Sequence, residues 1–514
     1  MTDIHKEVDP VTTGISQKGL STGTVGLIGA VVIGISCIAP AYTFTAGVGG
    51  AADAVGTQIP AILLVGFIPM LLVAFGYREL NRVMPDSGTS FTWAARAFGP
   101  WVGWMAGWGL IAATILVLSN LAGIAVDFLF LLIAQITNNP EIADITLNPF
   151  INVAVCLLFV AAAAWISYRD MQTSQKLQYW LVGFQLLVLI AFAIVAIVRA
   201  SQGDAYDPTP FSWGWFNPFA VPDLMMVVAG LSVSIFMFWG WDVTLTMNEE
   251  TKDPERTPGR AAALTIVSII IVYLLLTIGM TMFAGMGTDG LGLRNPDISG
   301  NVFFYLSGEI FGPLAFLVSL AVLTSSASSL QSTMVGPART LLAMGHYGAL
   351  PKKYASVSPR FFTPGYATIA SAVAAGGFYA VMRFVSEDAL WDTIAALGIM
   401  ICFYYGVTAF ACVWYFRHQW FDSVRNTFFT FLFPLIGGVM LLGLFVLSMG
   451  EAWRGELGSD ATLFGMSLVF VLGMGVILLG VVIMIIQYFR APDFFRGKTL
   501  GVYAPPSERV RSTR

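Results

Sequence analysis

The chain has 514 residues, of which 57% are hydrophobic and only 11% are charged, with a formal net charge of −4. An average soluble domain carries about 25% charged residues, and a water-soluble core cannot hide this much apolar surface. The long apolar runs are typical of membrane-spanning helices of about 20 residues each, not of the short alternating segments of a β-barrel. The composition therefore predicts an all-α membrane protein.

Twelve apolar runs follow one another along the chain, and we predict a transmembrane helix in each. They cover residues 24–52, 57–77, 101–133, 148–167, 177–198, 224–248, 261–286, 311–345, 365–385, 392–415, 427–449 and 462–489. Several runs are longer than one span needs, so tilt, breaks or extensions are expected. The polar N-terminus has no apolar stretch followed by a small-residue cleavage site, so no signal peptide is expected.

The placement of basic residues predicts the orientation, because Lys and Arg are retained on the cytoplasmic side of short loops. Of the 26 Lys and Arg residues, 22 lie in the two tails and in alternate loops. The other four, Arg199, Arg294, Arg383 and Arg454, lie in the opposite loops. We expect a multi-pass protein of the plasma membrane with both termini in the cytoplasm. Topology then explains the basic loops, and no nucleic-acid partner is expected.

Cysteine and histidine offer little for redox or metal chemistry. All four cysteines fall inside apolar runs without a CxxC pair, and the three histidines lie in the tail or near helix ends; these residues are Cys37, Cys156, Cys402, Cys412, His5, His346 and His418. We expect buried, inert thiols and no histidine metal site. No carboxylate or histidine cluster near an interface indicates an enzyme.

The runs divide into two halves of similar length, followed by two more helices. The predicted units are a cytoplasmic tail (1–23), a first repeat of helices 1–5 (24–200), an extracellular loop (201–223), a second repeat of helices 6–10 (224–415), helices 11–12 (416–490) and a second tail (491–514). Five helices per half invert the second half relative to the first.

Helices 1 and 6 each carry a mid-membrane interruption. The first contains Pro40, which removes a backbone donor, and the second contains Gly240 beside Asp242. Paired interruptions in inverted halves predict a transporter binding site at the midplane, because broken helices expose backbone polar groups there. A proline kink and a glycine packing contact are the simpler alternative.

Asp242 is the one carboxylate expected near the middle of a span, where a bare charge costs at least about 2.5–3.5 kcal/mol. It is interpreted as the acceptor of a substrate ammonium, the carrier of a coupled proton, or a tie between the broken helix and its neighbours. The aromatic residues around it are candidates for stacking on a cation, although rings in membrane helices more often pack. They are Phe236, Phe238, Trp239 and Trp241.

The eighth span contains a run of hydroxyl residues that includes Thr324 and Ser325. Two hydroxyl oxygens together with carbonyls from the interrupted first helix are suited to sodium. The alternative is that these hydroxyls hydrogen-bond within or between helices.

Three motifs resemble the amino acid/polyamine/organocation transporter superfamily. The segment 238–242 followed by Glu249-Glu250 and Asp253-Pro254 is similar to the sixth-helix signature of that superfamily. Residues 338–364 resemble the exit from its eighth helix and its re-entrant loop, and residues 79–88 resemble the loop after its second helix. Together these matches extend over residues 20–490.

The resemblance implies a five-plus-five inverted repeat with broken helices 1 and 6, in the fold of the bacterial leucine transporter. It implies that Ile38, Ala39 and Ala41 present backbone to the substrate and that Phe236 and Trp239 offer carbonyls to an amine. Trp241 and Asp242, singled out above by residue type and position, complete the predicted site. The resemblance further implies sodium ligands at Gly34, Cys37, Ala321, Thr324 and Ser325.

Two departures from the superfamily pattern bear on the substrate and on the coupled ion. Pro40 replaces part of a glycine-rich break whose amides would dock a carboxylate. Gln185 stands where proton-coupled members carry a lysine, which favours sodium.

The leading hypothesis is a sodium-coupled permease for an amino acid or related amine, working by alternating access. A proton-linked or exchange-type permease for a polyamine or organic cation is the alternative. A membrane sensor or a channel belongs to another class, but it would need a signalling domain or a continuous polar pore. A small-molecule substrate and the lipid bilayer are the expected partners, with sodium as the one possible cofactor.

Overall fold

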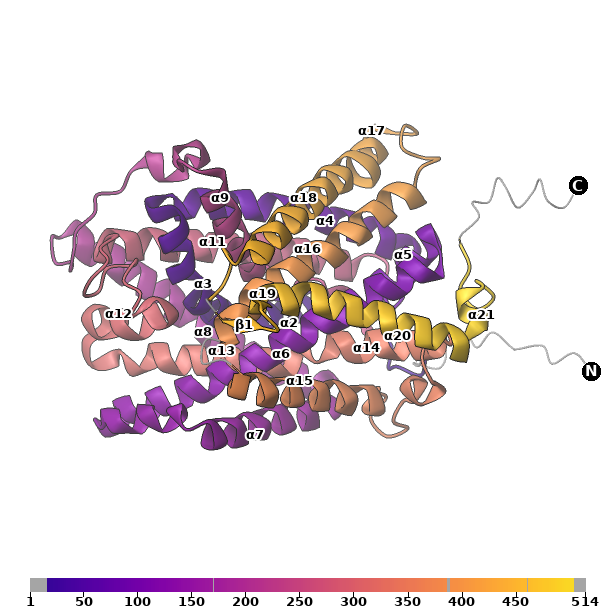
Figure 1. The fold of residues 1–514 in the computed structure, drawn as a ribbon, viewed down its shortest axis with the longest axis horizontal. Helices are drawn as coiled ribbons and strands as arrows, with labels where there is room; N and C mark the ends of the chain where they lie inside the picture. The colour runs from indigo at the N-terminus through magenta and orange to yellow at the C-terminus, as the bar shows by residue number, and fades with distance from the viewer. Residues whose placement is uncertain (1–15, 170, 386–388, 460, 503–514) are drawn as a thin grey trace, which may run out of the picture.

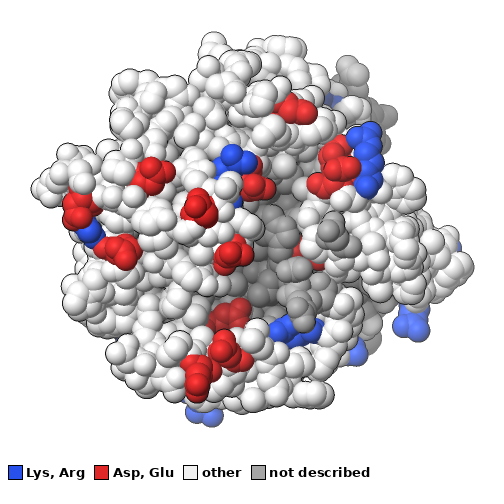
Figure 2. All heavy atoms as spheres, turned by 60° about the vertical axis from the view of Figure 1, so that its left-hand side comes forward, with Lys and Arg blue, Asp and Glu red and all other residues white. Residues whose placement is uncertain are grey.

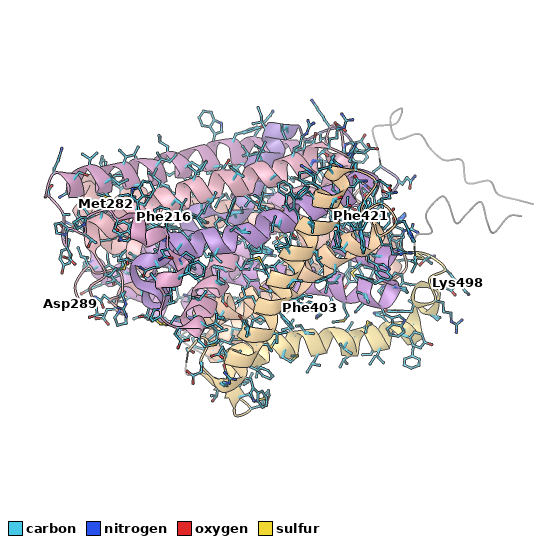
Figure 3. All side chains as sticks on the ribbon, turned by 90° about the horizontal axis from the view of Figure 1, so that it is seen from above. Phe216, Met282, Asp289, Phe403, Phe421 and Lys498 are labelled. Carbon is cyan, nitrogen blue, oxygen red and sulfur yellow. The ribbon has the colours of Figure 1, made fainter. Side chains whose placement is uncertain are left out.

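The computed structural model describes residues 16–169, 171–385, 389–459 and 461–502. These residues are mostly helical, as predicted, and the helices lie alongside one another in an elongated bundle (Figure 1). Figure 3 places Lys498 at one end of the bundle and Asp289 at the other. We refer to these as the Lys498 end and the Asp289 end.

The first half of the chain supplies seven α-helices. They are α2 (Leu27–Ile38), α3 (Pro40–Val55), α4 (Ile59–Val83), α5 (Ser90–Phe98), α6 (Pro100–Thr137), α7 (Pro149–Tyr168) and α8 (Met171–Ser201). Proline opens α3, α6 and α7, where the missing amide hydrogen would have had no helical partner. Asn148 caps α7 by accepting hydrogen bonds from the amides of Phe150 and Ile151.

The second half of the chain supplies eight α-helices. Its helices are α9 (Leu224–Met237), α10 (Val243–Thr246), α11 (Thr257–Ala284), α12 (Val302–Phe311), α13 (Phe316–Thr333), α14 (Val335–His346), α15 (Gly365–Val385) and α16 (Ala389–Tyr415). The C-terminal part contains α17 (Val424–Asn426), α18 (Phe433–Arg454), α19 (Leu468–Phe470), α20 (Val476–Arg490) and α21 (Pro492–Phe495).

Short elements connect these helices. The 3-10 turns are η1 (Gly56–Gln58), η2 (Pro140–Leu147), η3 (Trp213–Phe216), η4 (Pro218–Ala220), η5 (Asn248–Glu250), η6 (Ser299–Asn301), η7 (Gly312–Leu314) and η8 (Lys352–Ala355). Two π-helical turns, η9 (Thr427–Leu432) and η10 (Val471–Gly475), open α18 and α20. A two-stranded antiparallel hairpin, β1 (Thr462–Leu463) with β2 (Met466–Ser467), precedes α19.

Nine helical stretches in the described part of the chain are long and apolar enough to cross a membrane. One of them, Leu27–Val83, contains two of the predicted spans. The predicted spans 224–248 and 311–345 instead fold as pairs of shorter helices, α9 with α10 and α13 with α14. The expected total of twelve therefore stays a prediction.

The core brings helices of the two halves together. The long helix α6 packs against α13 and α16, α8 packs against α11, and α3 packs against α9. The short helix α2 lies among α8, α11 and α13. The ends of α2 and α9 are thus buried at the centre of the bundle.

Candidate functional site

The first helix interruption lies at Ala39, between α2 and α3. Ala39 adopts a left-handed conformation with φ of 55°, which ends α2 at Ile38 and lets α3 begin at Pro40. Ile38, Ala39 and Ala41 are fully buried. The first helix is therefore broken at a buried residue inside the core.

Few backbone amides remain free at the start of α3. Pro40 has no amide hydrogen, the Tyr42 amide donates to Ser325 Oγ at 3.5 Å, and the Thr43 amide donates to the Ala39 carbonyl. Among the first four residues of α3, only the Ala41 amide has no acceptor within the described residues. The positive end of this helix thus offers a weak site for an anion.

The second interruption separates α9 from α10 and passes directly beside the first. Gly240 has φ of 113°, and a Cβ built on it would lie 2.9 Å from the carbonyl carbon of Cys37. Both the backbone angle and the space require glycine here. The interruptions therefore meet backbone to backbone.

The Gly240→Ala variant is expected to fold poorly. Alanine would carry a strained backbone, costing about 1–3 kcal/mol, and its methyl group would push against the Cys37 main chain. Thermal unfolding of the purified protein should show a lower midpoint than wild type. Gly443→Ala is the matched control, because its Cβ meets no heavy atom within 4 Å and it lies inside α18. Equal midpoints for the two variants would contradict the close contact.

Asp242 is buried, with 2% of its surface exposed, and is held by two tyrosines of α16. Tyr405 donates its hydroxyl to Oδ1 at 2.8 Å, and Tyr404 donates to Oδ2 at 3.0 Å. Trp239 Nε1 donates to the Tyr404 hydroxyl at 2.6 Å. The carboxylate thus ties the second interruption to α16 and keeps lone pairs available for a further donor.

The aromatic residues around Asp242 pack against rings from other helices. Trp241 lies 5.0 Å from Tyr77 and 4.9 Å from Tyr405, measured between ring centroids. Phe236 meets the ring of Tyr42 edge to face at 6.0 Å, which joins α9 to α3. These contacts build an aromatic wall around both interruptions.

The two carbonyls predicted to receive an amine differ in their contacts. The Phe236 carbonyl accepts the amide of Trp239 at 3.1 Å within the turn. Within the described residues, no donor is directed at the Trp239 carbonyl. Of the two, the Trp239 carbonyl is therefore better placed to accept from a ligand.

The predicted sodium ligands are only partly brought together. Ser325 contacts the start of α3 through Tyr42, but Thr324 donates its hydroxyl to Leu320 and Ala321 within α13. The hydroxyl that reaches the Cys37 carbonyl belongs to Ser329, at 3.0 Å. A Cβ on Gly34 would meet Thr265 of α11 and Thr244. Ser329, one turn after Ser325 on α13, is therefore a further hydroxyl beside the end of α2, and the predicted sodium ligands stay a prediction.

Two glutamines of α8 lie seven residues apart and therefore on the same helix face. Gln178 accepts a hydrogen bond from Ser36 at 2.6 Å and donates to the Ser328 carbonyl at 3.1 Å. Gln185 is fully buried, and neither of its side-chain polar atoms has a partner among the described residues. An orphaned buried amide costs free energy unless a water, ion or ligand satisfies it. Gln185 Oε1 is therefore suited to bind an ion or to accept a hydrogen bond from a water or ligand.

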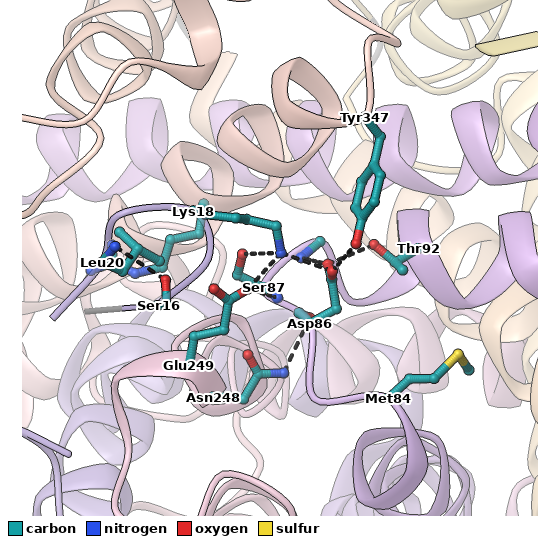
Figure 4. Close-up of polar contacts among 12 residues, drawn as sticks. Ser16, Lys18, Leu20, Met84, Asp86, Ser87, Thr92, Asn248, Glu249 and Tyr347 are labelled. Atoms are coloured by element: carbon teal, nitrogen blue, oxygen red, sulfur yellow. Dashed lines mark hydrogen bonds and ion pairs between the residues drawn. The ribbon is translucent and has the colours of Figure 1, made fainter. Parts of the chain in front are cut away.

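At the Lys498 end, the segment before α2 is anchored by Lys18. Its Nζ lies 2.8 Å from Asp86 Oδ2 and 2.5 Å from Glu249 Oε1 (Figure 4). Tyr347 donates its hydroxyl to Asp86 at 2.6 Å. We name these four residues, together with Ser87, the Lys18 cluster. It joins α2, the loop after α4, η5 and the end of α14.

The charges of the Lys18 cluster stabilise one another. Burial alone would raise the pKa of Asp86, but the charge and hydrogen bond of Lys18, with hydrogen bonds from Tyr347 and Thr92, lower it to about 2. Burial acts against charged Lys18, yet Asp86 and Glu249 outweigh it and raise the pKa of the ammonium above its ordinary value. Lys18 and Asp86 are therefore both charged at neutral pH.

Backbone and ionic contacts extend this connection next to the Lys18 cluster. The amides of Thr24 and Val25 donate to the Glu250 carbonyl, and Lys252 donates back to Val25. The Glu250 carboxylate binds the Arg339 guanidinium through two hydrogen bonds, and both side chains are buried. The predicted Glu249-Glu250 motif thus lies where four segments meet.

A model of the amino acid permease family matches residues 23–486. This chain belongs to that family. The permease is 22% identical over 434 residues to the low-affinity putrescine importer PlaP of Escherichia coli K12, covering 82% of this chain and 88% of that protein. It is 24% identical over 417 residues to the human large neutral amino acids transporter small subunit 2, covering 80% and 73%.

A solved structure has the same fold as the permease. The crystal structure of MhsT in complex with L-phenylalanine superposes with a TM-score of 0.59 at 17% identity, covering 82% of this chain and 98% of that one. The predicted membership of the amino acid/polyamine/organocation superfamily is confirmed. The permease is a multi-pass membrane transporter and not an enzyme.

Proposed function

We propose that this permease carries an amino acid or a related amine across the cell membrane by alternating access, coupled to sodium. The observation that carries the proposal is the buried Asp242 carboxylate at the point where the two helix interruptions meet. A buried carboxylate with spare lone pairs suits an ammonium group. The relatives' names, a putrescine importer and a neutral amino acid transporter, agree with an amine-bearing substrate.

The architecture of the proposal is twelve spans in two inverted repeats, 24–200 and 224–415, with both termini in the cytoplasm. In this scheme the Lys498 end faces the cytoplasm and the Lys18 cluster closes the inner side of the site. Support comes from the 22 Lys and Arg residues assigned to that side. The closed Lys18 cluster together with the buried interruptions is consistent with a state that does not open inward.

The substrate carboxylate is expected to contribute little to recognition. With Pro40 at the start of α3 and the Tyr42 amide directed to Ser325, one amide is left for an anion. An amide, ester or decarboxylated analogue should therefore compete for uptake within about tenfold of the parent amino acid, a difference of ~1.4 kcal/mol. Removal of the ammonium should be far more damaging, because the Asp242 carboxylate would face no partner charge.

Competition of radiolabelled uptake into proteoliposomes tests this ranking. The purified permease is supplied with the common L-amino acids and with putrescine, first in sodium buffer and then in choline buffer. If competitors need a carboxylate but not an amine, the proposal that the site recognises mainly the ammonium group is wrong.

We expect sodium binding to depend more on Ser329 and Ser325 than on Thr324. Ser329 contacts the Cys37 carbonyl, whereas Thr324 bonds within its own helix. Ser329→Ala should raise the sodium concentration for half-maximal uptake, and Thr324→Ala should change it less. Uptake measured across a sodium series for both variants gives the comparison. Wild-type uptake that is equal in sodium and in choline would reject sodium coupling.

The second candidate is a proton-linked or exchange-type permease for a polyamine or other organic cation. The poor anion site at α3 and the likeness to a putrescine importer favour it. Ion replacement separates the two, because this candidate predicts uptake that persists in choline and responds to a proton gradient or to a counter-substrate.

A further inference from the structure

A cavity of about 250 Å³ opens near the Asp289 end, and none of its lining residues belongs to either helix interruption. It lies between α6, η2, α7, α15 and the start of α16. We name it the outer cavity. Its polar walls include Asn120, Asp127, Asn152, Tyr379 and Arg383. Such a mixture of one acid, one base and amides differs from the aromatic wall around Asp242.

The helix geometry explains why these groups face one space. Asn120 and Asp127 are seven residues apart on α6, and Tyr379 and Arg383 are four apart on α15, so each pair shares a helix face. Tyr379 donates its hydroxyl to Asn152 at 2.5 Å, which fixes the wall formed by α15 and α7. The cavity is therefore built by packed elements and not by a loose loop.

Asp127 is the unusual group in this wall. It is partly buried in the span formed by α6, yet it takes part in no hydrogen bond with another described residue and in no ion pair within 4.0 Å. Arg383 lines the same cavity, with Nη2 3.4 Å from the Thr146 carbonyl. A carboxylate and a guanidinium thus face one small space without pairing directly.

We propose that the outer cavity is a second binding site for an α-amino acid in its zwitterionic form. Asp127 would accept the ammonium and Arg383 would hold the carboxylate through charge-assisted hydrogen bonds. The side-chain amides of the wall add neutral donors and acceptors. The volume suits a ligand of amino acid size and not a peptide.

The charge of this end of the molecule favours the same ligand. By position in the sequence, 16 of the 30 Asp and Glu residues but only four of the 26 Lys and Arg residues belong to the side of the Asp289 end. Figure 2 shows acidic residues outnumbering basic ones over this face. A zwitterion carries no net charge, so such a surface does not concentrate it but orients its ammonium group toward the protein, while Arg383 supplies a cation inside the cavity.

One residue connects the outer cavity to the first interruption. Asn120 lines the cavity and accepts the hydroxyl of Tyr42 at 2.5 Å, and Tyr42 belongs to the first turn of α3. The outer cavity is thus a separate site that shares a wall with the central one. Only the Asn120 side chain would lie between a ligand in the outer cavity and Tyr42 of α3.

Binding stoichiometry tests the proposal without relying on transport. The purified full-length permease in detergent is screened by thermal shift against the common L-amino acids, and equilibrium dialysis then counts the sites for each amino acid that stabilises it. Asp127→Asn and Arg383→Gln should each weaken one site by about tenfold or more, as expected for a lost charge-assisted hydrogen bond. Asp289→Asn, an exposed acid on the same side, is the matched control and should leave binding unchanged.

The ligand can be altered in parallel with the protein. Replacing the amino acid with its deaminated acid should weaken the outer site about as much as Asp127→Asn, and the two changes together should cost little more than either. Size-exclusion chromatography confirms that each variant is folded, and Arg383→Gln provides an independent reading if Asp127→Asn is not. The proposal would be overturned if Asp127→Asn and Asp289→Asn had the same number of binding sites with the same affinities. It would also be overturned if no amino acid bound more weakly to Asp127→Asn than to wild type. A single wild-type site that Asp127→Asn removes would support the outer cavity while rejecting the central site.

Discussion

Replacing Asp242 with asparagine is expected to reduce substrate uptake by about tenfold to a hundredfold while the protein remains folded and inserted. The carboxylate lies at the meeting point of the two interruptions and is fully buried. Asparagine preserves the size of the side chain but removes the charge that pairs with an ammonium, and a hydrogen bond to a charged group contributes about 1.5–3 kcal/mol. Initial uptake rates in proteoliposomes at matched protein content measure the loss.

Tyr405→Phe separates the charge of Asp242 from its structural role. This variant keeps the carboxylate but removes the hydroxyl that donates to Oδ1. If the charge receives the substrate, Tyr405→Phe should retain far more uptake than Asp242→Asn. If Asp242 acts only as a tie to α16, the two variants should lose similar amounts. Wild-type uptake by Asp242→Asn would remove this carboxylate from the mechanism altogether.

The second large effect is expected from Lys18→Met, which should open the path from the Lys498 end to the centre. The side chains of Lys18, Asp86 and Glu249 are 4%, 13% and 11% exposed, so the ion pairs are largely buried. Removing one partner of a buried pair costs about 3–5 kcal/mol, because the remaining charges are left without compensation. Here two carboxylates would be left close together between the loop after α4 and η5.

Cys37 reports on this opening, because it lies at the end of α2 and is 2% exposed. With the other three cysteines replaced by alanine, a small thiol reagent should modify Cys37 at least about tenfold faster in Lys18→Met than in the parent protein. Lys352→Met, an exposed lysine at the same end, is the matched control. Equal rates in the two variants would show that the Lys18 cluster does not hold this side closed.

A change of pH between about 5 and 9 should not open the Lys18 cluster. Asp86 has a lowered pKa, so its contribution is complete above the ordinary value near 3.8 and is lost only as the pH falls through about 2. The pKa of Lys18 is raised, so its contribution is lost only above its ordinary value of 10.5. Cys37 modification, corrected for the reactivity of the thiol itself, should therefore be insensitive between about pH 5 and pH 9.

Much of the fold was predictable because a membrane allows few alternatives. Apolar runs and the placement of Lys and Arg predict helices and their order without knowledge of packing. Helix ends were harder, since the run 311–345 contains the junction between α13 and α14 at Met334, where no glycine or proline marks the break; Gly336 and Pro337 follow only inside α14. Ala39 was predictable as the turning point only through its neighbour Pro40.

The candidate site was predictable where a residue is rare for its surroundings. Asp242 stands out because carboxylates are costly in a span, and Gly240 stands out beside it. Tyr404 and Tyr405 were missed because tyrosine is common in membrane helices and the sequence does not reveal a contact across 162 positions. Lys18 was interpreted only as part of the topological charge bias, although its burial and pairing are specific.

The hydroxyl run of α13 shows a different limit. Between residues 324 and 333 hydroxyl side chains spread over more than half of the helix circumference, so periodicity alone does not select the hydroxyl that meets α2. The resemblance predicts Thr324 and Ser325 as sodium ligands, and the Ser329 hydroxyl, which donates to the Cys37 carbonyl, is a further oxygen that the sequence did not single out. Only the packing of α2 against α13 decides between these neighbours.

The contact between Gly240 and Cys37 limits how the specificity of this permease can be engineered. Because the two main chains touch without an intervening side chain, the spacing between the interruptions cannot be adjusted by substitution at that point. A library aimed at larger or smaller cargo should therefore keep Gly240 fixed and randomise the surrounding rings, Tyr42, Phe236 and Trp239. The substrate range of this permease should then change through the surrounding aromatic side chains, while the main-chain contact between Gly240 and Cys37 stays the same.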